Sequence, residues 1–311
     1  MMNAECRMED GEKPGPVFDS SFIIHHSPFS PSVTVLMSVH NEARYLPLAV
    51  DSILAQTFGD FEFLIVDDGS TDGSWEYFAG LTDPRVRLLR NPHNLGLSRS
   101  LNAGLDAARG RYVARMDGDD VAEPGRLAAQ VAFLDAHPDM GIVGSGRTLI
   151  DEEGNVVAVA QAAGDDLAVR WKCLLGSPFA HPTVMLRRDV LERHGLRYRD
   201  VKRAEDYDLW PRLLAHARGA NLPEPLLQYR LRRRGELTRA DQLANHDRIA
   251  LSAIRLLVPG FAITPDEVTQ LRGRFGGYSV REPGFDPAEP RWVRRHEELR
   301  EAFGRSAGVM K

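Results

Sequence analysis

Short apolar runs alternate with amphipathic segments from residue 31 to about residue 120, and this alternation restricts the possible folds more than any other feature. Three of the apolar runs are bounded by turn residues and are typical of buried strands: Val33–Val39, Phe61–Val66 and Val86–Leu89. The segments that follow these runs carry apolar residues at helical spacing: Leu46–Gln56, Trp75–Leu81 and Leu97–Ala108. Repeated units of this kind predict an α/β fold, in which a mostly parallel, Rossmann-like sheet is flanked by helices.

A fourth apolar run ends in a dense acidic cluster. The sequence YVARMDGDD, at residues 112–120, places Asp117, Asp119 and Asp120 at the carboxyl end of a predicted strand, where ligands bind in open α/β sheets. Carboxylates this close repel one another unless a cation shares them, and their hard oxygen ligands suit Mg²⁺ or Mn²⁺. The cluster therefore predicts a metal-diphosphate site, and the apolar strand before it disfavours the plainer interpretation as a solvated loop.

Polar residues also follow the other three predicted strands, and all of them should reach the same sheet edge. A diphosphate needs amide donors, a ribose or base needs acceptors, and a metal needs carboxylates, and the edge offers all three. The residues concerned are His40, Asn41 and Glu42 after the first strand, Asp67 and Asp68 after the second, and Asn91, Asn94 and Gly96 after the third.

Charge and cysteine content exclude several classes of protein. The 311 residues carry a net charge of -5 with a sequence pI of about 6.1, which does not favour a nucleic-acid partner. Cys6 and Cys173 cannot form a disulfide framework and fit a reducing compartment. No apolar run approaches the roughly 20 residues that span a bilayer, and the first residues lack the apolar core of a signal peptide. We therefore expect a cytoplasmic protein.

Composition divides the chain into three regions. Residues 1–30 predict a flexible tail, residues 31–235 the α/β domain, and residues 236–311 a helical C-terminal extension. Within the domain, the pattern after residue 124 is mixed, with strands expected at 142–144, 183–186 and 226–230 and a hairpin near 151–155. Because a proline is best placed in a first helical turn, Pro211 predicts a helix that starts near Leu209 and leaves Asp206 in a loop.

Five motifs in this order resemble those of the bacterial family 2 glycosyltransferases of GT-A fold, and the resemblance covers roughly residues 32–232. The motifs are VLMSVHNE at 35–42, IVDDGSTDG at 65–73, NLGL at 94–97, RMDGDD at 115–120 and AEDYDLW at 204–210.

The resemblance implies an inverting transfer of a sugar from a nucleotide-diphosphate donor, most simply a UDP-sugar, to a hydroxyl of a glycan or lipid-linked acceptor. It implies that Asp206 is the general base and that Asp119, with Asp117, helps to hold Mn²⁺ or Mg²⁺. The Gln-x-x-Arg-Trp motif of processive members is absent, so we expect transfer of one sugar per encounter. The implied donor residues are His40, Asn41, Glu42, Asp68, Asn94, Gly96, Arg115, Asp117 and Gly118, and the acceptor side would include His181, Glu205 and Trp210.

Two other functions stay open at this level. A sugar nucleotidyltransferase would need a Gly-rich phosphate loop with Lys or Arg after the first strand, and residues 40–45 lack one. A catalytically inactive nucleotide-sugar binding or scaffold protein would have no use for Asp206 opposite a metal site. The basic run Arg230, Arg232, Arg233 and Arg234 could steer an anionic lipid-linked substrate, could touch the inner face of the membrane, or could be a solvated strand end.

Overall fold

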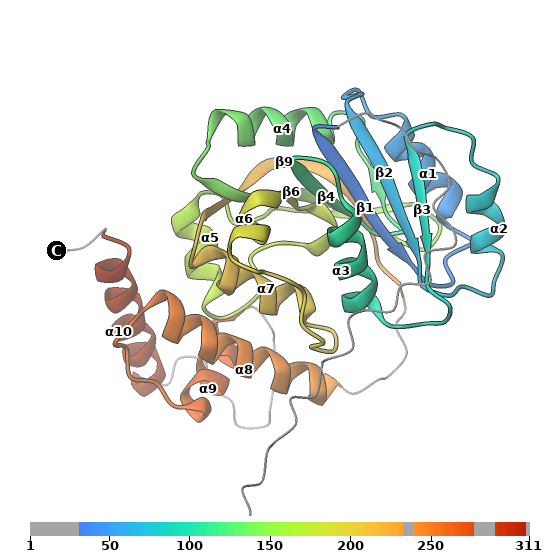
Figure 1. The fold of residues 1–311 in the computed structure, drawn as a ribbon. Helices are drawn as coiled ribbons and strands as arrows, with labels where there is room; N and C mark the ends of the chain where they lie inside the picture. The colour runs from blue at the N-terminus through green and yellow to red at the C-terminus, as the bar shows by residue number, and fades with distance from the viewer. Residues whose placement is uncertain (1–30, 233–238, 277–289, 309–311) are drawn as a thin grey trace, which may run out of the picture.

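The described residues form one nine-stranded sheet, in the order β3-β2-β1-β4-β8-β6-β9-β5, with β7 paired to β6 (Figure 1). The computed structural model describes residues 31–232, 239–276 and 290–308. The predicted tail at residues 1–30 lies outside the described residues. The strands are β1 (Val33–Val39), β2 (Phe61–Asp67), β3 (Val86–Arg90), β4 (Tyr112–Met116), β5 (Val121–Ala122), β6 (Met140–Ile150), β7 (Val156–Ala160), β8 (Met185–Arg187) and β9 (Arg218–Arg230).

Strands β3, β2, β1 and β4 are parallel, as their continuous apolar sequences predict. Alternate residues point to opposite faces, so Met37 joins the core under one layer of helices while Leu36 joins the core under the other. The first layer comprises α1 (Leu46–Leu54), α2 (Ser74–Ala79) and α4 (Arg126–Ala136). The second comprises α3 (Leu97–Ala107), α5 (Asp166–Cys173), α6 (Arg188–Arg193) and α7 (Glu205–Leu214).

Beyond β4 the sheet is mixed. Strand β8 is antiparallel to both β4 and β6, whereas β6 and β9 are parallel to each other. The predicted strand at 183–186 begins as a 3-10 turn (His181–Thr183), and the predicted strand at 226–230 is the end of the longer β9. The expected hairpin is formed by β6 and β7. The far end of β9 pairs with β5 and so reaches the acidic link after β4.

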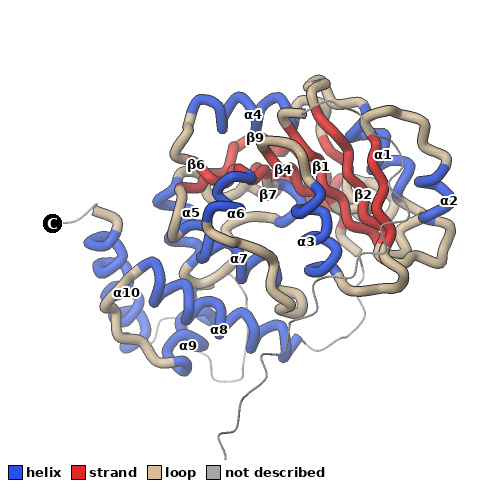
Figure 2. The backbone as a smooth tube through the Cα atoms, viewed as in Figure 1, coloured by secondary structure: helices blue, strands red, loops and turns tan. Residues whose placement is uncertain are grey.

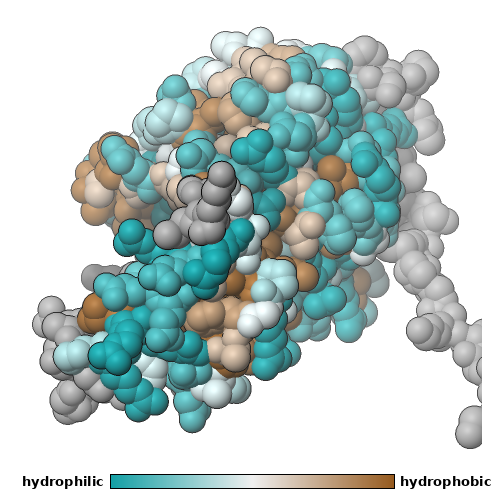
Figure 3. All heavy atoms as spheres, turned by 90° about the vertical axis from the view of Figure 1, so that its left-hand side faces the viewer, coloured by the Kyte–Doolittle hydropathy of each residue, from teal (hydrophilic) through white to brown (hydrophobic). Residues whose placement is uncertain are grey.

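The C-terminal helices lie on one side of the sheet and have an apolar core of their own (Figure 2). Helix α8 (Arg239–Leu257) packs against α7, α9 (Pro265–Phe275) against α8, and α10 (Pro290–Ser306) against α9. Leu174 and Leu175, which follow α5, join this second core and connect it to the α/β part. The face seen in Figure 3 is mostly hydrophilic with smaller apolar patches. Among the described residues no helix is long and apolar enough to cross a membrane.

Candidate active site

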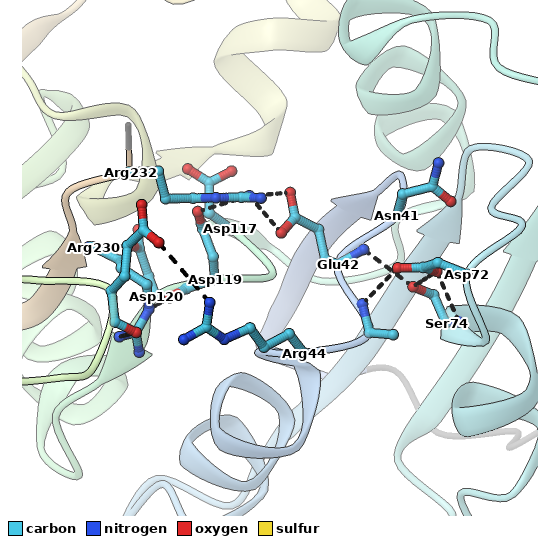
Figure 4. A network of polar contacts seen from close by, with 12 residues as sticks. Asn41, Glu42, Arg44, Asp72, Ser74, Asp117, Asp119, Asp120, Arg230 and Arg232 are labelled. Atoms are coloured by element: carbon cyan, nitrogen blue, oxygen red, sulfur yellow. Dashed lines mark hydrogen bonds and ion pairs between the residues drawn. The ribbon is translucent and has the colours of Figure 1, made fainter. Parts of the chain in front are cut away.

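The acidic cluster forms the four-residue link between β4 and β5. Suitable oxygens of Asp117, Asp119 and Asp120 all lie within 4.8 Å of one another. Their side chains approach Glu42 at the end of β1 and arginines at the end of β9 (Figure 4). The carboxyl ends of neighbouring strands therefore bring these charges together, as the sequence predicts.

These carboxylates suit a divalent cation. Asp120 is 1% exposed, its Oδ1 accepts a hydrogen bond of 2.8 Å from the Arg230 amide, and its Oδ2 is buried without a hydrogen-bond partner among the described residues. Burial, and then the charges of Asp117 and Asp119, raise the pKa of Asp120 well above its usual range. Burial and Asp117 likewise raise the pKa of Asp119. A shared cation would relieve this repulsion, so the residues fit Mg²⁺ or Mn²⁺.

Arg115, expected among the donor residues, lies beneath the cluster as a buried cation. Its side chain is 3% exposed and forms an ion pair with Asp117. Burial works against its charge, but the acidic groups around it, Asp117 foremost, together outweigh burial and hold the pKa of Arg115 above its ordinary value. Arg126, at the start of α4, is fully buried and donates a hydrogen bond of 2.6 Å from Nη2 to the Arg115 carbonyl. Arg126, which was not predicted from the sequence, supports the end of β4 from behind.

Hydrogen bonds join the loops after β1 and β2. Asn41 has a φ of 59°, in the left-handed region that asparagine tolerates better than most residues. Its Oδ1 accepts a hydrogen bond of 2.8 Å from the Thr71 amide, and its own amide donates to Ser70 Oγ at 3.0 Å. His40 Nδ1 lies 2.8 Å from the carbonyl oxygen of Asp68. The predicted donor residues His40 and Asn41 are therefore fixed by the neighbouring loop.

Asp68 holds the loop before α3 in place. Its carboxylate accepts hydrogen bonds from Asn91 Nδ2 at 2.7 Å, the Leu95 amide at 2.8 Å and the Gly96 amide at 2.9 Å. Asn94 Oδ1 also accepts from the Gly96 amide, at 3.0 Å. The structure thus gives Asp68 an organising role, and a contact between Asp68 and a nucleotide base stays a prediction.

Gly118 fits where a larger residue would collide with β1 and α1. A Cβ atom at this position would lie 3.0 Å from Val39 Cγ2 and 3.3 Å from Leu46 Cδ2. The missing side chain lets the acidic link run close to the end of β1. Gly118 therefore positions the carboxylates on either side of it.

The expectation that Asp206 lies in a loop is wrong. Helix α7 begins at Glu205 and continues through Pro211, so Glu205 and Asp206 occupy its first turn. Proline removes a single helical hydrogen bond, and the buried apolar face of α7, which includes the fully buried Trp210, outweighs that loss. Asp206 also accepts hydrogen bonds from backbone amides of the first turn. This position favours negative charge at Asp206 because the amides of a first helical turn have no partner within the helix.

Burial shifts the protonation of the Glu205–Asp206 pair. Burial and the charge of Asp206 raise the pKa of Glu205 to about 7. Burial also raises the pKa of Asp206, against the lowering effects of its backbone hydrogen bonds and of Arg115. Arg115 therefore acts electrostatically on both the acidic link after β4 and the Glu205–Asp206 pair. A carboxylate with a raised pKa is the better proton acceptor near neutral pH.

Two residues expected on the acceptor side, Trp210 and His181, are buried. Trp210 is 0% exposed, and its ring packs edge-on against Phe179 and His181, so it offers no surface to an acceptor. His181 is buried, and its Nε2 lies 2.9 Å from the Tyr198 hydroxyl. Burial and then Arg115 lower the pKa of His181 well below its usual range, which keeps the ring neutral.

Arg230, the last residue of β9, and Arg232, two residues beyond it, complete the site; from the sequence they were predicted only as part of a basic run. Arg230 is 5% exposed, and its Nε donates to the Asp119 carbonyl at 2.8 Å. Arg232 Nη1 lies 2.6 Å from both carboxylate oxygens of Glu42 and 3.3 Å from Asp119 Oδ2 (Figure 4). A two-residue spacing at a strand end places side chains on one face, and this was the signal available in the sequence.

Solved structures identify the fold as that of the GT-A glycosyltransferases. Staphylococcus aureus TarS 1-349, in complex with UDP-GlcNAc, matches with a TM-score of 0.63 and 19% identity over 90% of this chain and 84% of that one. The mannosyltransferase PcManGT from Pyrobaculum calidifontis, in complex with GDP-Man and Mn²⁺, matches with a TM-score of 0.60 and 20% identity over 91% and 86% of the two chains. The predicted fold class is confirmed.

Sequence comparison gives the family. The model of glycosyl transferase family 2 matches residues 34–195, and the chain belongs to this family. EpsE of Bacillus subtilis (strain 168), a provisionally assigned glycosyltransferase, is 39% identical over 208 residues, which cover 64% of this chain and 73% of EpsE. The O-antigen biosynthesis glycosyltransferase WbnJ of Escherichia coli is 34% identical over 208 residues, covering 64% of this chain and 79% of WbnJ.

Proposed function

We propose that the protein transfers a single sugar, with inversion, from a nucleotide-diphosphate donor to a hydroxyl group. The observation that carries this proposal is that two clusters of carboxylates, the acidic link at 117–120 and the Glu205–Asp206 pair, both interact with the buried guanidinium of Arg115. Asp117 pairs with Arg115, and the same guanidinium lowers the pKa values of Glu205 and Asp206. A metal-diphosphate site and a base within electrostatic reach of each other are what a single displacement at an anomeric carbon requires.

The donor would lie along the carboxyl ends of β1, β2 and β4. We assign its binding to the fixed loops described above, with Asn41, Asp68 and Asn94 toward the nucleoside and Asp117 toward the ribose. Bound UDP-GlcNAc in TarS and GDP-Man with Mn²⁺ in PcManGT support a nucleotide-sugar donor. We favour a UDP-sugar because the first of the two neighbours binds one.

Asp119, with Asp117 and Asp120, would hold Mn²⁺ or Mg²⁺. Such a cation, when bound, would stabilise the negative charge that develops on the departing diphosphate. The buried, unpartnered Asp120 Oδ2 supports this assignment from the protein side.

Asp206 would accept the proton of the acceptor hydroxyl as that oxygen bonds to the anomeric carbon and the bond to the diphosphate breaks. The raised pKa of Asp206 supports this role, and the amides of the first turn of α7 would keep the carboxylate oriented. Attack opposite the leaving group inverts the anomeric centre. Glu205, with a pKa of about 7, would adjust the basicity of Asp206 through its own charge.

For the acceptor we propose a glycan or lipid-linked saccharide in cell-envelope polysaccharide synthesis. WbnJ, named for O-antigen biosynthesis, supports this class. Residues 31–235 would form the transferase domain and residues 236–311 a helical extension. A cytoplasmic protein that meets its acceptor at the inner face of the membrane would be consistent with this proposal.

Two variants separate a transferase from its alternatives. Asp206→Asn should keep nucleotide binding and lose turnover by about 100-fold or more, because only the base is removed. Asp119→Asn should lose Mn²⁺-dependent binding of UDP. Asp189→Asn, at an exposed position in α6, is the matched control and should change neither property.

The assays are calorimetric titration with UDP and GDP and a hydrolysis or transfer assay with the nucleotide sugars of whichever nucleotide binds. Full turnover by Asp206→Asn would reject the proposed base. Pyrophosphate release from a nucleoside triphosphate and a sugar 1-phosphate would identify a nucleotidyltransferase instead. Binding without turnover by the unsubstituted protein would favour a scaffold.

A further inference from the structure

Among the described residues, Arg232 is the one whose guanidinium forms an ion pair with the Asp119 side chain. Nη1 of Arg232 lies 2.6 Å from each carboxylate oxygen of Glu42 and 3.3 Å from Asp119 Oδ2. The side chain of Arg232 is 35% exposed, whereas those of Glu42 and Asp119 are 20% and 15% exposed. A half-exposed cation therefore bridges one residue assigned to the donor and one assigned to the metal.

The partners of Arg232 differ in kind from those of the two other arginines of the site. Arg230 donates to backbone carbonyls of Asp119 and Asp151, and Arg115 is buried against Asp117. Arg232 instead holds two carboxylate side chains, and its ring contact is the face of Tyr45, with Cζ 5.3 Å from the ring centroid. The guanidinium of Arg232 donates to no backbone carbonyl of the described residues, so it is the least tied to the fold of these three arginines.

A divalent cation on Asp119 would meet this guanidinium at close range. Two positive charges beside one carboxylate repel each other, and the repulsion is strong in a partly buried site. A nucleoside diphosphate, in contrast, brings several negative charges that attract an arginine fork. Both effects would move the guanidinium of Arg232 away from Asp119 and toward the donor diphosphate.

We propose that Arg232 competes with the divalent cation for Asp119 and couples metal binding to donor binding, by leaving Asp119 for the donor diphosphate when the cation binds. This inference rests on the proposed function, and it makes Arg232 a positioning residue that sets the order and cooperativity of binding. Metal and nucleoside diphosphate should then bind more tightly together than either binds alone.

The test measures Mn²⁺ affinity by electron paramagnetic resonance of free Mn²⁺, with and without UDP or GDP, so that it does not depend on catalysis. Arg232→Ala should bind Mn²⁺ alone up to about fivefold more tightly than the unsubstituted protein, because the competing charge is gone. In saturating Mn²⁺ it should bind the nucleotide about tenfold more weakly, because the arginine is no longer available to the diphosphate. The cooperativity between metal and nucleotide should fall accordingly.

Two further variants control the test. Arg44→Ala removes an arginine that also lies over Tyr45 but pairs with Glu152, at 3.9 Å, and it should leave both affinities unchanged. Arg232→Lys keeps the charge and should retain the weak binding of Mn²⁺ alone. It also keeps the proposal testable if the alanine variant fails to fold.

The outcomes separate the inference from the function it rests on. If the unsubstituted protein shows Mn²⁺-dependent nucleotide binding and Arg232→Ala has the same metal affinity and cooperativity, the role of Arg232 is overturned and the donor site stands. If neither protein binds Mn²⁺ with or without nucleotide, the proposed metal site fails and the inference fails with it.

Discussion

Replacing Arg115 by methionine tests how the site tolerates its crowded carboxylates. Arg115 pairs with Asp117 and is 3% exposed, so Arg115→Met keeps an apolar stem but removes the buried charge. Removing one partner of a buried ion pair costs about 3–5 kcal/mol because the other charge is left uncompensated. Since Asp117 is 28% exposed and water can solvate it partly, we expect a loss of about 3 kcal/mol in the free energy of unfolding at neutral pH.

The loss should depend on pH. Burial already raises the folded-state pKa values of Asp119, Asp120 and Glu205, and Arg115 lowers all three. Removing Arg115 raises these pKa values further above their unfolded values. A carboxyl group with a raised folded-state pKa binds its proton more tightly in the folded protein, so stability rises as the pH falls through that pKa. The deficit of Arg115→Met should therefore shrink as the pH falls from about 7 to about 5.

Urea unfolding followed by circular dichroism, over a series of pH values, measures this deficit. Arg193→Met is the control because Arg193 is exposed and pairs with Asp189 four residues away on α6, so its effect should stay below about 0.5 kcal/mol at every pH. Asp117→Asn in the Arg115→Met background should recover part of the loss. A deficit below about 1 kcal/mol, or one that does not change with pH, would refute this electrostatic account of the site.

Three further predictions concern single side chains. Glu205 has a pKa of about 7, so Glu205→Gln should remove an inflection near that pH from the pH profile of kcat/KM, measured with whichever sugar donor is found. Burial and Arg272 lower the pKa of His246 from 6.5 to about 4, so between those pH values the unsubstituted protein should lose about 3 kcal/mol more unfolding free energy than His246→Gln. Gly69→Ala should cost at least about 2 kcal/mol in thermal unfolding, since its Cβ would lie 2.5 Å from the backbone carbonyl carbon of His93 at a φ of +67°. The control Gly73→Ala, at a φ of +94° with open space around it, should cost only about 1 kcal/mol.

The parallel half of the sheet could be predicted from the sequence because its strands are buried on both faces. Val33–Val39 coincides with β1, since every second residue on either face contributes to a core and the run is continuously apolar. The start of β9 was not predictable in this way. Pro223 and Pro225 interrupt its hydrogen-bonding pattern, and exposed residues at 223–225 weaken its apolar signal. Pairing with β6, which the local sequence does not encode, makes the whole segment a strand.

The same limit applies to the site. Residues within one motif, such as Asp117 and Asp119, could be placed together because the chain connects them directly. The contact between Glu42 and Arg232 joins residues 190 positions apart, and only the order of strands in the folded sheet brings them together. The predicted start of helix α7 was wrong for a related reason. Burial of the apolar face of α7 in the tertiary structure overrides the preference of Pro211 for a first helical turn.

The arginines of the site differ in the kind of partner that holds them, and this difference predicts three different consequences of removing them. Arg115 is buried against the carboxylate of Asp117, and replacing it leaves that charge uncompensated. Its loss should therefore appear first as a lower free energy of unfolding. Arg230 donates to the carbonyls of Asp119 and Asp151, so its loss should alter the geometry of the acidic link. Arg232 binds side chains whose charge a metal ion can neutralise equally well. Its loss should therefore change how ligands bind, with little effect on folding, because a half-exposed ion pair contributes at most about 1 kcal/mol.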